Sequence, residues 1–387
     1  MTSNSLGKVS GKGGEYMASV SVDSLRAYTY AYIDINYLLE NEWRKWVNKK
    51  DGTTSYFKKN GHLLFWYFPK GILLIKFSVP KFYYGTNAKP YNLDNADLII
   101  KLIDHKIKIL FPNTDISSFQ NWICTEIHPF VHYYMDNEKD KITYLECLKK
   151  MQYLRLKKHT FSTGIQARNG SYALNIYSKF DEIKSRAINK PSSVSDADFA
   201  ILSKVKNVLR FEYQVKKAYL RRNYKNNRTI KDVLTKQFCE NLLWDAIKKA
   251  NLNNHFLYKD ELIQKIENEF GKIKASNLIE FVNDYNEMPK DFIDAKYPQK
   301  TQNNYIRILK EKTINPVYLP NKVSEKIDFS NFSEPDKVNF KFLLIKLLII
   351  INLIKKYLIQ QINNDVKYLT ASSVFSPPAF FFEDGGG

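Results

Sequence analysis

The chain has 387 residues, and 59 Lys or Arg against 40 Asp or Glu give it a formal net charge of +19. A hydrophobic content of 44% with 26% charged residues is ordinary for a globular protein, and the length allows two or three domains. Such a positive charge is expected of a protein that binds a polyanion, although AT-rich codons would also raise the lysine content without a functional demand.

The three cysteines, Cys124, Cys147 and Cys239, are far apart and form no CxxC pair, which argues against a disulfide framework or a structural zinc site. No secretory signal pattern opens the sequence. The apolar run 342–354 is about 13 residues long, below the roughly 18 to 20 needed to cross a bilayer. We therefore expect a cytoplasmic protein with no membrane partner.

Residues 1–20 are rich in Gly, Ser and Lys, which predicts a disordered N-terminal tail. From residue 21 to 226, aromatic and β-branched runs alternate with turn signals, which indicates an α+β sheet domain. Strands are predicted at 29–39, 63–67, 72–79, 122–134, 172–177 and 208–215, with helices near 93–110 and 142–156.

Two segments in this domain carry candidate chemistry. SYALNIYSKFDEIKSR, from Ser171, places Tyr177, Lys179 and Glu182 at the end of a strand-like run. VLRFEYQVKKAYLRR, from Val208, puts Arg210 and Glu212 on one strand face, because side chains alternate along a strand. A tyrosine with a nearby lysine and carboxylates on neighbouring strands could break and rejoin a phosphodiester.

The Tyr177, Lys179 and Glu182 spacing followed by the Leu209–Glu212 strand resembles the rolling-circle replication initiators of the filamentous phage gene II/X type, which many small plasmids share. The likeness extends over roughly residues 70 to 317. Its further blocks are 74–87 (LIKFSVPKFYYGTN), 122–133 and 274–317. One departure is visible: Cys124, Thr125 and Glu126 stand where the family usually carries an Arg-hydrophobic-Asp sequence.

This resemblance implies an antiparallel-sheet, HUH-like nickase domain in which Tyr177 attacks phosphorus, keeps the 5′ phosphate as an ester and releases a 3′ hydroxyl. Lys179 would steady the phenolate or the pentavalent phosphate, beside Glu182. Tyr172 and Tyr213 are reserve nucleophiles, and Tyr213 should point away from Glu212.

Glu126 and His128 lie on one strand face with a hydrophobic residue between them, and they are the candidate metal ligands. Glu212 could complete the set, or it could instead orient Arg210 or Lys179. A carboxylate with an imidazole suits Mg²⁺ or Mn²⁺. His132 falls on the same face and is expected at the rim.

A basic run from Lys204 to Lys231 contains ten Lys or Arg residues and one acid, Glu212. We expect it to contact the DNA backbone, and Tyr219 and Tyr224 are available to stack on unpaired bases. The expected DNA-binding residues are Arg210, Lys216, Lys217, Arg221 and Arg222, with Lys81 and Asn87 as a second backbone contact.

A weak internal repeat appears when 72–84 is aligned with 208–220. The four identities are Leu73 with Leu209, Val79 with Val215, Lys81 with Lys217 and Tyr83 with Tyr219. If the repeat is real, two related sheet halves exist, and Lys76 stands where the second half has Glu212. The first half would then bind DNA while the second cuts it.

Beyond residue 226 the pattern becomes helical, which predicts a DNA-binding or accessory domain over 227–317. A helix-turn-helix arrangement with Thr301–Lys312 in the major groove and a plain helical bundle both fit. Residues 318–387 are expected to hold a linker to 334, an apolar helix at 342–359 and a disordered tail.

The sequence therefore predicts a metal-dependent, site-specific endonuclease that initiates rolling-circle replication of a plasmid or phage. Its implied partners are double-stranded origin DNA, single-stranded DNA, and a host helicase and polymerase, and a homodimer is left open. The alternatives are a relaxase- or transposase-like nickase and a non-catalytic DNA- or RNA-binding protein.

Overall fold

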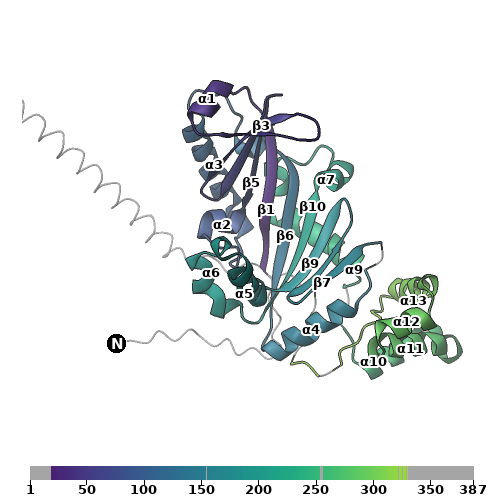
Figure 1. The fold of residues 1–387 in the computed structure, drawn as a ribbon. Helices are drawn as coiled ribbons and strands as arrows, with labels where there is room; N and C mark the ends of the chain where they lie inside the picture. The colour runs from purple at the N-terminus through teal and green to yellow at the C-terminus, as the bar shows by residue number, and fades with distance from the viewer. Residues whose placement is uncertain are drawn as a thin grey trace, which may run out of the picture. The chain divides into compact units, whose positions relative to one another are not determined.

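The computed structural model describes residues 19–329 except 154, 253–255, 321, 325 and 328. It contains a ten-stranded antiparallel sheet together with many helices, which confirms the α+β class (Figure 1). The strands are β1 (Ser19–Tyr30), β2 (Arg44–Val47), β3 (Thr54–Asn60), β4 (Leu63–Phe68), β5 (Ile72–Ser78), β6 (Ile123–Tyr134), β7 (Lys157–Phe161), β8 (Gly164–Arg168), β9 (Tyr172–Ser178) and β10 (Val208–Lys216).

The strand order in the sheet is β2-β3-β4-β5-β1-β6-β10-β9-β8-β7. The two halves of this order, counted outward from the central β1–β6 pair, follow the same pattern. On one side β1 is followed by β5, β4, β3 and β2, and on the other β6 is followed by β10, β9, β8 and β7. Each half ends with a short helix directly after its last strand, α2 (Val79–Tyr84) or α7 (Lys217–Asn223). The two halves thus share one topology, in agreement with the weak repeat in the sequence.

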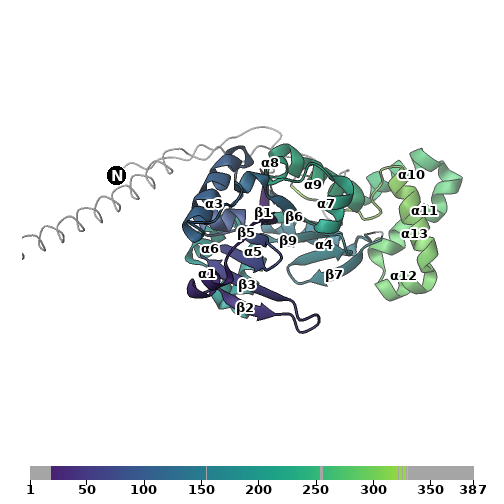
Figure 2. The ribbon, with the colours of Figure 1, turned by 90° about the horizontal axis from the view of Figure 1, so that it is seen from above.

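The later helices of the two halves also correspond. The first half continues into α3 (Ala96–Leu110) and the second into α8 (Ile230–Val233) and α9 (Lys236–Ala250). Figure 2 shows α3, α8 and α9 on one side of the sheet. Their apolar residues join those of the strands in one large hydrophobic cluster, to which α4 (Glu138–Lys150) also contributes.

Alternation in β4 and β5 shows that this part of the sheet has one face in the core, whereas β6 and β10 at the centre are buried on both faces. Along β4 (LLFWYF) and β5 (ILLIKFS), side chains alternate strictly between buried and half-buried, as expected for a strand with one face in the core. At the end of β5, Ser78 caps α2 by accepting from Lys81 N, and Gly85 ends that helix with φ 78°, a conformation that favours glycine.

Some predicted boundaries were wrong. A strand was predicted over 29–39, but β1 ends at Tyr30 and Asp34 caps α1 (Ile35–Glu40) by accepting from Asn36 N. The helix predicted at 142–156 runs from Glu138 to Lys150, where Asn137 caps its start. β1 also begins at Ser19, inside the expected tail, while residues 1–18 lie outside the described range.

The border between the two predicted domains also lies elsewhere. The predicted break after residue 226 would separate α9 from the sheet, but Leu242, Leu243 and Ile247 of α9 are fully buried in the cluster of the sheet. A second cluster holds together α10 (Lys259–Phe270), α11 (Lys272–Glu287), α12 (Lys290–Lys296) and α13 (Gln299–Glu311). The chain is thus helical after residue 226, as α8 begins at Ile230, but α8 and α9 pack on the sheet while α10 to α13 have a hydrophobic cluster of their own.

The described residues of the expected linker, 318–329, are not a free connection. Ile327 and Phe329 are fully buried, Tyr133 Oη donates to Phe329 O over 2.6 Å, and Tyr144 Oη accepts from Ile327 N over 2.7 Å. The apolar segment 342–359 and the predicted disordered tail lie outside the described residues. In the described part of the chain, no helix is both long and apolar enough to cross a bilayer.

Candidate active site

Polar side chains gather on the face of the sheet opposite the hydrophobic cluster, where four central strands meet. The pairing register places Arg210 of β10 between His132 of β6 and Tyr177 of β9. Two residues along, Glu212 lies between Phe130 of β6 and Asn175 of β9. Because alternate residues share a face, this register brings Tyr177, Arg210 and Glu212 together.

Asp23, His128 and Glu212 form the centre of the site. Each is buried and offers one ligand atom, and these atoms lie within 4.8 Å of one another. His128 Nδ1 is 3.7 Å from Glu212 Oε1. The structure thus brings together two of the predicted metal ligands, His128 and Glu212, and adds Asp23 from β1.

Glu126, the third predicted ligand, lies on the outer side of the imidazole. Its Oε1 is 2.9 Å from His128 Nε2, and its carboxylate also pairs with Arg26 at 3.4 Å and Lys76 at 3.6 Å. The hydrogen bond from His128, reinforced by these cations, lowers the pKa of Glu126 to about 2 although burial opposes it. This carboxylate fixes the ring and leaves the other nitrogen, Nδ1, facing Glu212.

Arg210 is fully buried inside the site, which corrects its predicted role as a DNA-backbone contact. Its guanidinium lies 2.8 Å from Asp23 and 3.3 Å from Glu212, donates from Nη1 to Asn87 O over 2.8 Å, and stacks 3.6 Å from the centre of the Phe130 ring. A side chain without exposed surface cannot contact a phosphate backbone outside. Arg210 instead neutralises the two carboxylates.

Tyr177 is half-buried at the end of β9, and its hydroxyl donates to Glu212 Oε2 over 3.2 Å. Burial raises the pKa of the phenol well above 10, against the lowering effect of Arg210. The phenol is therefore protonated at neutral pH and needs a proton acceptor before it can act as a nucleophile. Glu212 Oε2 is in position to be that acceptor.

Lys179 reaches the same site by a route that differs from the prediction. β9 ends at Ser178, whose hydroxyl caps α5 (Lys179–Asn189) by accepting from Asp181 N, so Lys179 is the first residue of a helix and does not continue the strand. It is fully buried, and its Nζ donates to Asn87 Oδ1 over 3.0 Å and to Glu182 over 2.8 Å. Burial lowers the pKa of Lys179 to about 8.

Asn87 and Glu182 complete the surroundings of Lys179. Asn87 donates from Nδ2 to Asp23 Oδ1 over 3.1 Å, so it connects the lysine to the central carboxylate. Asn87 was predicted as a DNA-backbone contact, but its side chain is taken up by the site. Glu182 pairs with Lys179 and Arg186, and these cations lower its pKa although burial opposes them.

The charges around Asp23 keep it ionised. Burial opposes ionisation, but the positive charges of Arg210 and Lys179 outweigh that cost and hold the pKa of Asp23 well below its usual range. Two anionic oxygens and one imidazole nitrogen within reach of one point form a donor set suited to a divalent cation. Glu126 completes the common arrangement in which a carboxylate orients a ligating histidine. The residues therefore fit a metal ion.

Four of the predicted DNA-binding residues in the basic run have exposed side chains, and their contact with DNA stays a prediction. Lys216, Lys217, Arg221 and Arg222 are exposed where β10 ends and α7 begins. Lys81 is half-buried in α2 and donates to Ser193 O over 3.5 Å. It is therefore engaged with its own chain.

The positions of Tyr213, Tyr219 and His132 can be compared with their predicted positions. Tyr213 points away from Glu212, as predicted, and donates to Asp245 over 3.2 Å. Tyr219, predicted to stack on bases, is buried and donates to the same carboxylate over 2.5 Å. His132 is fully buried rather than at the rim, neither ring nitrogen has a hydrogen-bond partner in the structure, and burial lowers its pKa well below 6.5.

Asp23 is the functional residue that sequence reasoning missed. It is the one acid in the segment SVSVDSLRAYTY, which became β1. A lone carboxylate in a strand that alternates between polar and apolar residues is a signal, since burying a charge without a partner is costly. Comparison of the sequence with protein-family models found no match, and a search of curated proteins found none either. The geometry of the site must carry the functional argument.

Proposed function

We propose that this protein is a replication initiator that nicks one strand of a plasmid or phage double-stranded origin through a 5′-phosphotyrosine intermediate and so starts rolling-circle replication. The observation that carries the proposal is the contact between Tyr177 Oη and Glu212 Oε2, next to the Asp23, His128 and Glu212 group. A tyrosine held against a carboxylate, beside a group of residues that could hold a divalent cation, suits phosphodiester transesterification.

The chemistry follows from the positions of these groups. Tyr177 Oη passes its proton to Glu212 and attacks phosphorus, which breaks the bond to the 3′ oxygen and leaves the 5′ phosphate esterified to the tyrosine. The departing 3′ oxygen takes up a proton and becomes a hydroxyl. Lys179, whose Nζ lies 5.9 Å from the centre of the Tyr177 ring, would stabilise the phenolate from inside the site. Bound Mg²⁺ or Mn²⁺ would polarise the non-bridging oxygens.

The first half of the sheet supports a polynucleotide substrate. One row of cross-strand neighbours consists of Tyr28 of β1, Leu74 of β5 and Trp66 of β4. On the same face, Arg26 of β1 forms an ion pair with Glu126. Tyr28 and Trp66 are half-buried and Tyr30 is 70% exposed. Aromatic rings beside Arg26 and Lys76 offer stacking for unpaired bases next to charge for phosphates.

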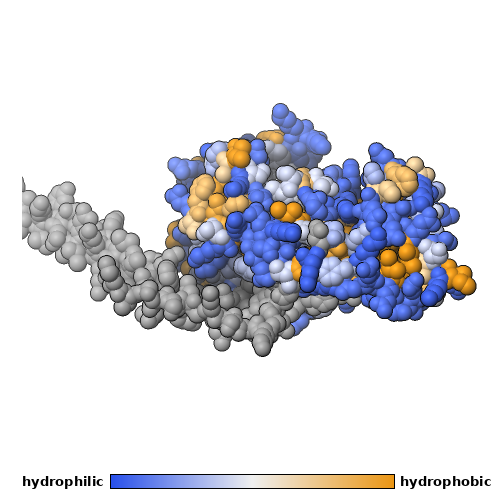
Figure 3. All heavy atoms as spheres, turned by 90° about the horizontal axis from the view of Figure 1, so that it is seen from below, coloured by the Kyte–Doolittle hydropathy of each residue, from blue (hydrophilic) through white to orange (hydrophobic). Residues whose placement is uncertain are grey.

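Exposed cations add to this support. Lys216, Lys217, Arg221 and Arg222 lie beyond the end of β10, and Figure 3 shows that hydrophilic side chains cover most of the face seen from below. The helical part, with α13 as the helix predicted for the major groove, would choose the origin. Partners in this proposal are origin DNA, single-stranded DNA, and a host helicase and polymerase in the cytoplasm.

A second function has its own support. Arg210 already pairs with both Asp23 and Glu212, and such a buried ion-pair network can exist for stability alone. The exposed basic residues would then make the protein a non-catalytic DNA- or RNA-binding protein. A relaxase- or transposase-like nickase would share the chemistry and differ in its biological outcome.

One experiment separates these functions. The protein is incubated with supercoiled plasmid carrying its origin and Mn²⁺, and open circles and a protein-linked 5′ end are measured. We expect Tyr177→Phe to abolish nicking and to keep DNA binding, and Tyr172→Phe, on the other face of the sheet, to nick like the parent. Supercoiled plasmid that stays unchanged with the parent protein would favour the non-catalytic function.

A further inference from the structure

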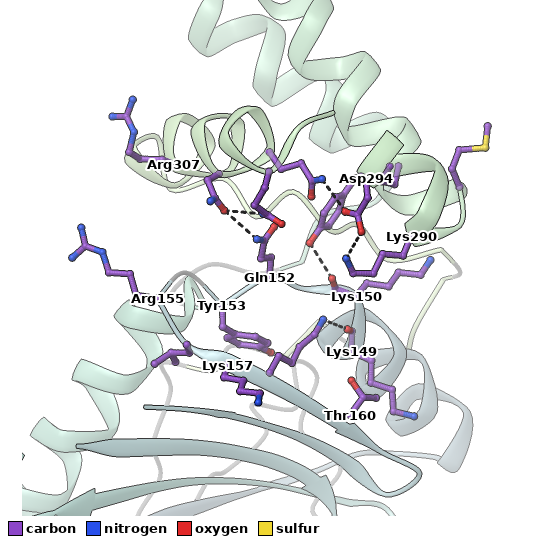
Figure 4. Close-up of a pocket in the computed structure, with 18 of the residues that line it drawn as sticks. Lys149, Lys150, Gln152, Tyr153, Arg155, Lys157, Thr160, Lys290, Asp294 and Arg307 are labelled. Atoms are coloured by element: carbon purple, nitrogen blue, oxygen red, sulfur yellow. Dashed lines mark hydrogen bonds and ion pairs between the residues drawn. The ribbon is translucent and has the colours of Figure 1, made fainter. Parts of the chain in front are cut away.

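A large cleft lies between one wall formed by the end of α4 and β7 and a second wall formed by the helices α11 to α13. None of the candidate active-site residues lines it. It has a volume of about 1080 Å³, and Figure 4 shows side chains from both walls converging on it. Gln152 on one wall donates to Asn303 of α13 over 3.0 Å, and Lys150 donates to Asn286 O over 2.7 Å. The walls are thus connected by hydrogen bonds at the edge of the cleft.

The lining is strongly cationic. Seven lining side chains are Lys or Arg, and two, Glu146 and Asp294, are acidic. Both acids are already paired, Glu146 with Lys149 at 2.9 Å and Asp294 with Lys290 at 2.6 Å. Five cations remain in excess over the lining acids. Three of them have partners in the protein, because Arg307 pairs with Glu311 while Lys150 and Lys158 donate to backbone carbonyl oxygens. A bound anion would lower the remaining repulsion between the cations.

Two of these cations have no counterion among the described residues. The side chains of Arg155 and Lys157 are exposed, and neither side chain makes a hydrogen bond or an ion pair with a described residue. Arg155 has φ 66°, an uncommon backbone conformation for a non-glycine residue. Arg307, on the opposite wall, is 57% exposed at its side chain and pairs with Glu311 of its own helix.

We propose that this cleft binds the phosphodiester backbone of DNA, with Arg155 and Lys157 on one wall and Arg307 on the other. The proposal rests on the proposed function for its choice of polyanion, and it extends that function to a site outside the sheet. A groove with an excess of cations, two of them without a counterion among the described residues, suits a chain of phosphates, because each phosphate replaces a small counterion that the groove otherwise attracts. The cleft would hold the origin while the sheet acts on the strand.

The test measures binding in the full chain carrying Tyr177→Phe, so that no cleavage interferes. A fluorescent duplex containing the origin and a single strand of the same length are titrated at several salt concentrations. The double variant Arg155→Glu, Lys157→Glu should weaken binding of at least one of the two DNAs by about tenfold or more and should lower the salt dependence. Arg307→Glu, on the other wall, should weaken the same DNA.

The matched control is Lys101→Glu with Lys106→Glu, two exposed lysines of α3 whose exchange changes the net charge equally. It should bind nearly as well as the parent. Unchanged binding of both DNAs by the cleft variants, or an equal loss in the control, would overturn the proposal. Nicking of plasmid by the parent is scored separately, so a cleft that binds DNA in a protein that never nicks would remain supported while the nickase proposal fails.

Discussion

Arg210 illustrates how a single buried residue prepares this site. Its guanidinium pairs with Asp23 and Glu212 and stacks on Phe130, so the carboxylates stay ionised in a place from which water is largely excluded. Removing only one partner of such a network leaves an uncompensated buried charge, which typically costs 3–5 kcal/mol. The network is therefore expected to be intolerant of single substitutions at Arg210.

The central carboxylates lead to a prediction about metal binding. Mn²⁺ should raise the unfolding temperature of the parent protein, because a ligand that binds only the folded state stabilises it by about 2.7 kcal/mol at a hundred times its Kd. Asp23→Asn should remove most of this rise, measured by differential scanning fluorimetry with and without EDTA.

The control for that measurement is Asp97→Asn, an exposed aspartate of α3. It should keep the full response to Mn²⁺. An equal response in Asp23→Asn and in the parent would place any bound ion away from Asp23.

Lys179 leads to a prediction about pH. Burial lowers its pKa to about 8, so its charge is present below that pH and lost above it. If the cation stabilises the phenolate of Tyr177, the nicking rate should fall as the pH rises through about 8. Lys179→Arg, whose guanidinium stays protonated, should keep its rate to higher pH. The rates are measured between pH 6.5 and 9.5 with equal Mn²⁺.

A nicking rate that rises through pH 8 in the parent would contradict this role, since a neutral amine would then be the active form. Circular dichroism of Lys179→Arg checks that the variant folds, because the larger side chain enters a fully buried position.

At the scale of the elements, the sequence could predict single strands but not which strands pair or in which register. Alternation in the segments 172–177 and 208–215 was sufficient to predict β9 and β10 and the shared face of Arg210 and Glu212. It does not say which strands are neighbours. Asp23 reaches the site only because β1 pairs with β6 through a register shift between Val22 and Leu25, and nothing local in the sequence specifies such a pairing.

Burial caused the remaining errors. Arg and Asn are mostly exposed in folded proteins, so the sequence alone favoured a surface position for Arg210 and Asn87. The structure buries Arg210 because two carboxylates and an aromatic ring satisfy its charge. The missed strands β2, β3 and β7 contain Lys, and β8 contains Gly and Gln, which weakens their strand signal.

The first half of the sheet provides a prediction at this scale. Trp66 lies half-buried in β4 on the face that carries Tyr28 and Lys76. If unpaired bases stack there, single-stranded DNA should quench the fluorescence of Trp66, and Trp66→Ala should weaken single-strand binding by about 1–3 kcal/mol, roughly 5- to 150-fold.

Phe292→Ala, on an exposed ring of α12, is the control and should leave binding unchanged. Equal affinity of Trp66→Ala and its parent for single-stranded DNA would remove the first half of the sheet from the DNA path.

At the scale of the whole molecule, one topology is used twice with different polar groups. The second half carries Tyr177, Lys179 and Glu212. The strands of the first half carry aromatic side chains such as Tyr28 and Trp66, together with the cations Arg26 and Lys76. The two halves meet at the β1–β6 pair, where Arg26 and Glu126 form an ion pair at 3.4 Å. In the proposed function, the first half would bind the single strand and also contribute Asp23 to the site, while the second half would carry the nucleophile.

The most direct test of the nickase account is to identify the residue that becomes linked to DNA. The protein is incubated with origin DNA and Mn²⁺, digested with nuclease and protease, and analysed by mass spectrometry for a peptide that carries a nucleotide. The account predicts a 5′-phosphate ester on Tyr177. A nucleotide linked to another residue, or a nicked plasmid without any linked peptide, would contradict it.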